Sequence, residues 1–189
     1  MRKNILPRNF YTRPTLEVAK SLLGKYLVRR LDQGEIAGKI VETEAYLGVH
    51  DGASHALGGK RTGRNRAVYM VGGHAYIYLI YGMYWLINIS TENEGIPKCV
   101  LIRAIEPNNG NYKETNGPGK LCRWLKLDKS FYAEDLTCSN RLWIEDRHIN
   151  IDTISLISRP RVGVDYAGEE WSQKPLRFYI KGNPAVSRP

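Results

Sequence analysis

The chain has 189 residues, 42% of them hydrophobic, and carries 28 Lys and Arg against 19 Asp and Glu, a formal net charge of +9. This length fits one domain, because single cores run to roughly 100–200 residues. The sequence has no apolar run of the roughly 18–20 residues that cross a bilayer, and its basic start lacks the apolar segment of a signal peptide, so we expect a cytoplasmic protein, nucleoid-associated if bacterial.

The first element that the sequence predicts is a helix over 14–23. Leu16, Ala19 and Leu23 form an apolar stripe with helical spacing, and Gly24 lies just past its end. Beyond this helix, alternating apolar and polar residues predict mainly strands. We expect strands over 26–31, 35–46, 75–81, 84–90, 98–105 and 176–180, a short helix over 119–125, and otherwise irregular structure in the last third.

Strands in local succession with few helices between them indicate an α+β protein. We therefore expect one domain over 1–189, with a mixed, largely antiparallel curved sheet flanked by helices. The glycine-rich motifs that bind phosphates in doubly wound nucleotide folds do not occur in the sequence.

The surplus of positive charge favours a polyanionic partner, because each phosphate that a protein neutralises releases condensed counterions. Nucleic acid is the first candidate for this partner, and a membrane surface or acidic small molecules are the other candidates. The charge could also belong to a generic basic surface with no specific partner.

Two glutamates lie close together in the segment 42–46. The two-residue period of a strand puts Glu42, Glu44 and Tyr46 on one face. Carboxylates beside an aromatic ring are costly to bury unless they are paired or catalytic. The alternative is that both simply face solvent on an edge strand, and the spacing leaves both glutamates open as candidates.

Tyrosines are concentrated in the expected hairpin over 75–90. Tyr76 and Tyr78 share one strand face, whereas Tyr81 lies at the turn beside Gly82. An aromatic residue at the tip of a hairpin in a basic protein suggests a wedge that enters a base stack. Packing is the alternative, and for Tyr76 and Tyr84 it is the expected role.

The segment 48–66 is polar and predicts a functional loop. Its glycines and four cations could hold phosphates, with a solvated charge run as the alternative. His55 lies in this loop without the pattern of a zinc site or a nucleobase deaminase around it. The three cysteines are expected to be reduced thiols, mostly buried; they are Cys99, Cys122 and Cys138.

These motifs together resemble the alkyladenine (3-methyladenine) DNA glycosylase family, over nearly the whole chain. The resemblance implies a single mixed α/β domain whose fold is related to a domain of formyltransferases. It also implies that this chain binds duplex DNA containing damaged purines and needs no metal or other cofactor. We expect a monomer. The matching stretches are 40–48, 62–66, 76–84, 88–90, 99–104, 117–122, 161–164 and 174–179.

The resemblance also implies the residues of the reaction. Glu44 corresponds to the family's general base, and Arg103 to an arginine that helps to hold the water and the DNA backbone. Tyr46 and Tyr78 match the tyrosines that sandwich the flipped base. His55 matches a histidine that contacts the base edge and the sugar, and Glu42 is left as a structural residue.

Further roles concern recognition of the DNA. Asn88 matches the asparagine that crowds the position of guanine's amino group, and Tyr81, with Met83 beside it, is expected to enter the duplex. Human-type members have a serine where this chain has Asn183, which leaves a hydroxyl contact to DNA in doubt. The residues expected to contact the DNA backbone are Arg61, Arg64, Arg66 and Lys120.

The expected reaction is hydrolysis of the N-glycosidic bond of 3-methyladenine, hypoxanthine or ethenoadenine by a water that ionised Glu44 activates. The matched motifs contain no lysine in the place of an attacking amine, so we expect a monofunctional enzyme that leaves an abasic site. A non-enzymatic nucleic-acid-binding module, and an RNA-modifying or nucleoside-hydrolysing enzyme, are the competing interpretations.

Overall fold

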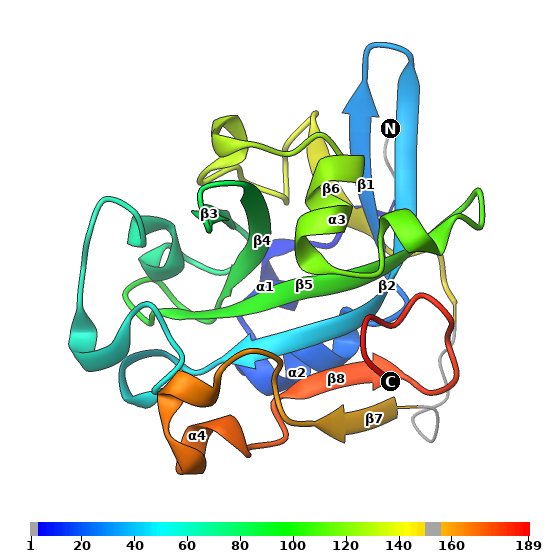
Figure 1. Cartoon of the computed structure of the whole chain (residues 1–189). Helices are drawn as coiled ribbons and strands as arrows, with labels where there is room; N and C mark the ends of the chain where they lie inside the picture. Colours follow the sequence, from blue (N-terminus) through cyan, green and yellow to red (C-terminus); the bar gives the residue numbers. More distant parts are fainter. Residues whose placement is uncertain (1–3, 150–155) are drawn as a thin grey trace.

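A curled antiparallel sheet organises the residues that the computed structural model describes, which are 4–149 and 156–189 (Figure 1). Its main path is β3-β4-β5-β2-β1-β6, while β8 pairs with β2 and β7 pairs with β8. The pairings between these strands are all antiparallel. The strands are β1 (Tyr26–Leu31), β2 (Gly34–Tyr46), β3 (Ala75–Ile80), β4 (Tyr84–Thr91), β5 (Lys98–Pro107), β6 (Leu142–Glu145), β7 (Leu156–Arg159) and β8 (Arg177–Ile180).

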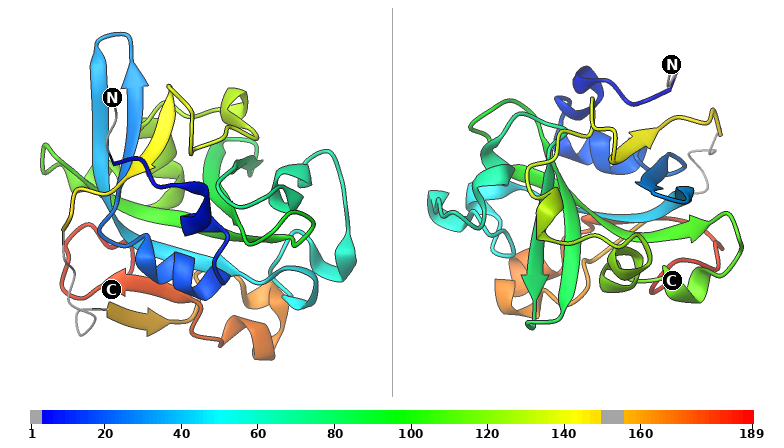
Figure 2. Two further views of the ribbon diagram at one scale, coloured as in Figure 1. Left: turned by 180° about the vertical axis from the view of Figure 1, so that it is seen from behind. Right: turned by 90° about the horizontal axis from the view of Figure 1, so that it is seen from above.

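Short helices cover the sheet. Figures 1 and 2 show α2 on one face of β2 and α3 on the opposite side, against β4 and β5. None of the helices described is long and apolar enough to span a membrane. The α-helices are α1 (Arg8–Tyr11), α2 (Thr15–Ser21), α3 (Pro118–Trp124) and α4 (Glu169–Ser172), and the 3-10 turns are η1 (Gly48–His50), η2 (Leu57–Gly59), η3 (Arg66–Tyr69), η4 (Tyr112–Glu114), η5 (Lys129–Phe131) and η7 (Asp165–Ala167).

The long strand β2 changes its neighbour along its length. Its residues 34–39 pair with β1 and its residues 38–46 pair with β5, while residues 42–44 pair with β8 on the side opposite β5. The register with β5 shifts on either side of Glu42, as expected for a β-bulge, which bends a strand and re-aims its side chains. Residues 42–44 therefore lie in the interior of the sheet.

The alternation predicted for β2 holds beyond the bulge. Thr43 and Ala45 face α2: the Thr43 hydroxyl donates to the carbonyl of Ala19 at 2.9 Å, and Ala45 packs in the main apolar core. Glu42 and Glu44 point to the other side, where both contact Arg103. The prediction that these glutamates share one face is thus confirmed, whereas the alternative of a solvent-facing edge strand is wrong.

The α+β class and the antiparallel character of the sheet are confirmed, and the predicted strands up to residue 107 agree with β1 to β5 within two residues. The expectation of an irregular last third is wrong. Strands β6 and β7 have only four residues each, too few to show alternation, and they form because β1 and β8 offer them partners. The first three residues of the basic N-terminal segment lie outside the described residues, and the likeness to formyltransferases stays a prediction.

Candidate active site

Two buried glutamates and one arginine form the acidic centre of the molecule. Arg103 on β5 reaches both carboxylates of β2: its Nε lies 3.2 Å from Glu42 and its Nη1 lies 3.4 Å from Glu44. Both glutamate side chains are 0% exposed. A buried carboxylate needs charged or hydrogen-bonding partners, and the position of β2 between two strands supplies them from both sides.

Glu42 is held by the C-terminal part of the chain. Its Oε1 accepts a hydrogen bond from Arg177 on β8 at 2.8 Å, and its Oε2 accepts one from the backbone N–H of Ser187 at 2.8 Å. The Ser187 hydroxyl in turn accepts from Arg103 at 3.1 Å. Glu42 thus joins β2 to β8 and to the segment around Ser187, which are the contacts of a structural residue.

Glu44 has a different set of neighbours. Its Oε1 accepts from the backbone N–H of Val162 at 2.8 Å, and its Oε2 accepts from the Tyr46 hydroxyl at 3.1 Å. Burial raises the pKa of Glu44 above the ordinary value, opposed by the charge of Arg103 and by these two hydrogen bonds. A carboxylate with a raised pKa is a stronger base, which suits it to accept a proton from water.

Tyr46 is fixed by a buried ion pair. Asp51 and Arg161 are joined by hydrogen bonds of 2.6 and 2.8 Å, and both side chains are fully buried. The guanidinium of Arg161 lies 4.7 Å from the centre of the Tyr46 ring and donates to the carbonyl of Ala45 at 3.0 Å. Asp51 also accepts from the backbone N–H of Leu47. The pair therefore locks the strand end and one face of the Tyr46 ring together.

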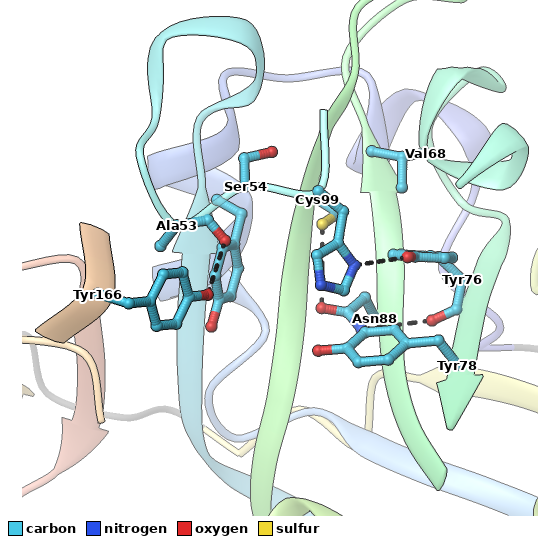
Figure 3. A pocket seen from close by; sticks show the side chains of 10 residues that line it. Ala53, Ser54, Val68, Tyr76, Tyr78, Asn88, Cys99 and Tyr166 are labelled. Atoms are coloured by element: carbon cyan, nitrogen blue, oxygen red, sulfur yellow. Dashed lines mark hydrogen bonds between the residues drawn. The ribbon is translucent and has the colours of Figure 1, made fainter. Parts of the chain in front are cut away.

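A narrow cavity of about 30 Å³ opens beside this strand end. Figure 3 shows Tyr166 next to Ala53 on one side and Tyr76, Tyr78 and Asn88 on the other. A cavity of this size holds only a few water molecules. Tyr46, His55, Tyr78 and Asn88, all predicted to bind the base, line it together with Ala53, Ser54, Val68, Tyr76, Cys99 and Tyr166.

His55 is positioned by two contacts. Its Nδ1 and the Tyr76 hydroxyl are 2.7 Å apart, and its carbonyl accepts from the side chain of buried Asn65 at 2.8 Å. Burial, with Arg64 nearby, lowers the pKa of His55, so the ring is neutral at pH 7. Tyr78 packs edge-on against the imidazole, with ring centres 4.7 Å apart. Tyr76, expected only to pack, therefore orients a pocket residue.

The turn of the β3–β4 hairpin presents Tyr81 and Met83 to solvent, with 82% and 65% of their surfaces exposed. Tyr81 adopts a φ of 53°, in the left-handed region that bulky residues rarely occupy. Strained residues of this kind cluster at functional sites. An exposed and strained aromatic residue is hard to explain by packing, which favours the wedge predicted for Tyr81.

The predicted phosphate-binding cations lie in different places. Arg64 is near the cavity, 5.4 Å from the centre of the Tyr78 ring, whereas Arg61 and Arg66 line a separate hollow. Lys120 lies on α3 and donates to Asn116. Two further cations missed by the sequence reasoning, Arg123 and Lys126, line a hollow beside Met83 and Tyr84.

The structure thus brings Glu44, Arg103 and the four base-binding candidates into one region, and of the four predicted phosphate-binding cations it places Arg64 there. Sequence reasoning gave no individual role to several residues that support the site. These are Asp51, Asn65, Arg161, Val162, Tyr166, Arg177 and Ser187. Asn65, Arg161, Val162 and Arg177 do lie in the stretches that carried the resemblance, which is the one signal that could have identified them.

The side chain of Asn183, which stands where human-type members have a serine, donates to Glu106 at 2.8 Å and accepts from the N–H of Ala185. The cysteines are free thiols, with Cys99 and Cys122 buried and Cys138 exposed, as expected. Burial raises the pKa of Cys99 to about 12, so this thiol of the cavity wall is unreactive at pH 7. The described residues contain no group of three or more His, Cys, Asp or Glu that could hold a metal ion.

Known proteins resemble this chain over nearly its whole length. The family model described as methylpurine-DNA glycosylase matches residues 9–184. A protein of Legionella pneumophila is 48% identical over the whole of both chains, and one of Methanocella arvoryzae is 46% identical over 97% of this chain and 96% of its own; both names refer to 3-methyladenine DNA glycosylase. Human DNA-3-methyladenine glycosylase is 42% identical over 94% of this chain and 66% of the human protein. The chain belongs to the methylpurine-DNA glycosylase family.

Proposed function

We propose that this protein is a monofunctional base-excision-repair DNA glycosylase, a single catalytic domain over 1–189 that acts as a monomer without a cofactor. It takes an alkylated or deaminated purine out of duplex DNA and hydrolyses its N-glycosidic bond. One observation carries the proposal: the buried base Glu44, hydrogen-bonded to Tyr46, stands beside an aromatic cavity in a protein with a net charge of +9.

In this proposal ionised Glu44 accepts a proton from the water that attacks C1′ of the sugar. General-base help of this kind is typically worth about 10²–10⁴ in rate. The charge of Glu44 also stabilises oxocarbenium character at the sugar. Arg103 keeps the carboxylate ionised, and the N–H of Val162 and the hydroxyl of Tyr46 each hold one of its oxygens. Each oxygen keeps a second lone pair, which can accept the proton of the water.

The aromatic walls compensate for the cost of base flipping. Unstacking a base costs a few kcal/mol, least for a damaged or mispaired one. Each aromatic partner can return about 1–3 kcal/mol, so stacking on Tyr46 and Tyr78 offsets that cost. Every base has a π-face, hence selection falls to edge contacts such as those of His55 and Asn88. The candidate substrates are 3-methyladenine, hypoxanthine and ethenoadenine.

Around the pocket, Tyr81 and Met83 fill the space that the flipped base leaves in the duplex. The phosphates on either side pair with cations of the surface. We assign this role to Arg61, Arg64, Arg66 and Lys120, and add Arg123 and Lys126 because they border the hollow next to Met83 and Tyr84.

A single assay tests the proposed function. The protein is incubated with duplexes that each carry one lesion, and half of each sample is then treated with hot alkali. Strand breaks that require alkali support a monofunctional glycosylase, and their dependence on the lesion gives the substrate preference. DNA binding without breaks would point to a non-enzymatic module, and a borohydride-trapped adduct would contradict the monofunctional mechanism.

The pH dependence of excision should follow Glu44. Because the base must be ionised, the single-turnover rate should rise as pH passes upward through the raised pKa of Glu44. The charge of Arg103 lowers that pKa, so Arg103→Gln should move the rising, acidic limb of the pH–rate profile to higher pH. Glu42→Gln removes a neighbouring negative charge and should move this acidic limb to lower pH. The rates are measured on a hypoxanthine duplex from pH 4 upwards, and identical limbs in all three proteins would exclude Glu44 as the titrating base.

Replacing Tyr81 should separate base capture from general DNA affinity. Tyr81→Ala removes the side chain that occupies the vacated position in the duplex, so the flipped base should return to the stack at least tenfold faster. Affinity for undamaged duplex should change less than twofold, and thermal stability should not fall, since the side chain of Tyr81 is 82% exposed and packs against little. Stopped-flow fluorescence of an ethenoadenine duplex and a melting curve measure these effects. If the variant loses affinity for damaged and undamaged DNA equally, Tyr81 has a general DNA-binding role only.

A further inference from the structure

The cavity between Tyr166 and Tyr78 is too small for the base that the proposed function places there. At about 30 Å³ it accepts a few water molecules, whereas the fused rings of a purine need several times that space. A wall of the cavity must therefore move when a base enters. The contacts that hold each wall decide which of them can move.

The residues opposite Tyr166 are held on several sides. Tyr76 is 2% exposed and contacts His55 at 2.7 Å, and Asn65 holds the backbone of His55. Tyr78 lies against both of these rings, with centre-to-centre distances of 4.7 Å to His55 and 5.1 Å to Tyr76. Asn88 is buried and donates to the carbonyl of Tyr76. Displacing any one of them breaks contacts with the others.

Tyr46, which also lines the cavity, is fixed equally well. Its hydroxyl donates to Glu44, and Arg161 lies against its ring while being locked to Asp51. Moving the Tyr46 ring would disturb the base Glu44 and a fully buried ion pair. The wall that opens is therefore a different one.

Tyr166 has the features of a movable wall. It is 73% exposed, and its hydroxyl makes one long hydrogen bond, 3.4 Å, to the carbonyl of Ala53, which lines the cavity beside it (Figure 3). It lies in the three-residue turn η7, between Gly163 and Gly168, which have φ values of 74° and 79°. Glycines in this conformation let the turn pivot without the strain that a side chain would impose.

We propose that Tyr166 is the gate of the base pocket: it swings away from Ala53 to admit the flipped base and closes against it, so that this residue sets how long the base stays. The proposal rests on the proposed function. Tyr166 acts by contact with the base and takes no part in proton transfer, which Glu44 carries out. Its removal should therefore change base entry and return while leaving the acidic limb of the pH profile in place.

Gly52 offers a second way to disturb the gate without touching Tyr166. A Cβ at this position would lie 2.6 Å from the carbonyl oxygen of Ala167, a backbone atom of the turn that cannot rotate out of the way as a side chain could. Gly52→Ala must therefore push η7 away from the loop that carries Ala53. Its effect should be in the same direction as that of Tyr166→Ala and smaller, because the ring itself remains.

The test follows base entry and return by stopped-flow fluorescence with a duplex containing one ethenoadenine. All proteins carry Glu44→Gln so that excision does not interfere. Tyr166→Ala should speed both entry and return at least fivefold, with a larger effect on return. Tyr166→Phe keeps the ring and loses the bond to Ala53, so it should speed entry about twofold and leave return unchanged. Tyr112→Phe on η4 (Tyr112–Glu114) serves as a control tyrosine that does not line the cavity.

Flipping rates of Tyr166→Ala equal to those of the parent, with unchanged melting temperature, would overturn the gate while leaving the glycosylase function intact. Loss of affinity for undamaged duplex in the same proportion would overturn it as well, since Tyr166 would then be a general DNA contact. If wild-type protein releases no base in the alkali assay and gives no fluorescence change, the proposed function and the gate both fail.

Discussion

Replacing Glu44 with glutamine should lower base excision at least a hundredfold while the protein still binds hypoxanthine DNA. Glutamine has the shape of glutamate, and its oxygen can accept the hydrogen bond that Val162 donates, so the fold should be kept. It cannot accept the proton of the attacking water, and it removes the negative charge beside the sugar. Loss of general-base help accounts for about 10²–10⁴ in rate. Single-turnover excision and a binding titration with the same duplex measure the two effects.

Glu42→Gln is the matched control for this experiment, because the two glutamates differ by two positions on one strand and share Arg103. Both oxygens of Glu42 accept hydrogen bonds, from Arg177 and from the N–H of Ser187, so an amide group there loses one of them. We expect a lower melting temperature and less than a tenfold change in excision. Wild-type excision by the Glu44 variant, or an equal loss in both variants, would remove Glu44 from the catalytic role.

Breaking the buried pair of Asp51 and Arg161 should strongly destabilise the folded protein. Burial alone would raise the pKa of Asp51, but hydrogen bonds from Arg161 and from the N–H groups of Leu47 and Ala53 lower it below the ordinary value. Removing one partner leaves the other charge buried without compensation, which typically costs about 3–5 kcal/mol. Asp51→Ala and Arg161→Met should each lower the free energy of unfolding by about that amount.

A double-mutant cycle with urea denaturation tests this expectation. The double variant should cost less than the sum of the single ones, because it leaves no unpaired charge in the interior. Excision by the folded fraction should also fall in the single variants, since Arg161 supports the ring of Tyr46. Lys174→Ala, which breaks an exposed pair with Glu170, is the control and should change stability by less than about 1 kcal/mol. Additive losses in the cycle would show that the two residues act independently.

Local pattern was enough to predict much of this molecule. The long alternating segment of β2 determined a strand, and its parity put Glu42 and Glu44 on one face. The turn at Gly82 placed Tyr81 at the tip of a hairpin. These features depend on the two-residue period of strands and on the conformational freedom of glycine, which act over a few residues and can be recognised without the rest of the chain. The family resemblance added the choice of Glu44 over Glu42.

Only the tertiary structure decided what surrounds these residues. The bulge at Glu42 and the change of neighbour from β1 to β8 bury both carboxylates and bring Arg103 and Arg177 to them from opposite sides. Arg161, Val162 and Tyr166 are separated from the residues they contact by more than one hundred positions in the sequence. The separation between Glu44 and Val162, for example, is 118 positions. Local pattern carries no information about such contacts, because they depend on which strands pair and where the chain returns. For this protein the sequence by itself determined that Glu42 and Glu44 share one face of a strand and that Tyr81 lies at the tip of a hairpin. The pairing of the strands determined that both carboxylates are buried, and it supplied the neighbours that suit Glu44 to act as a base.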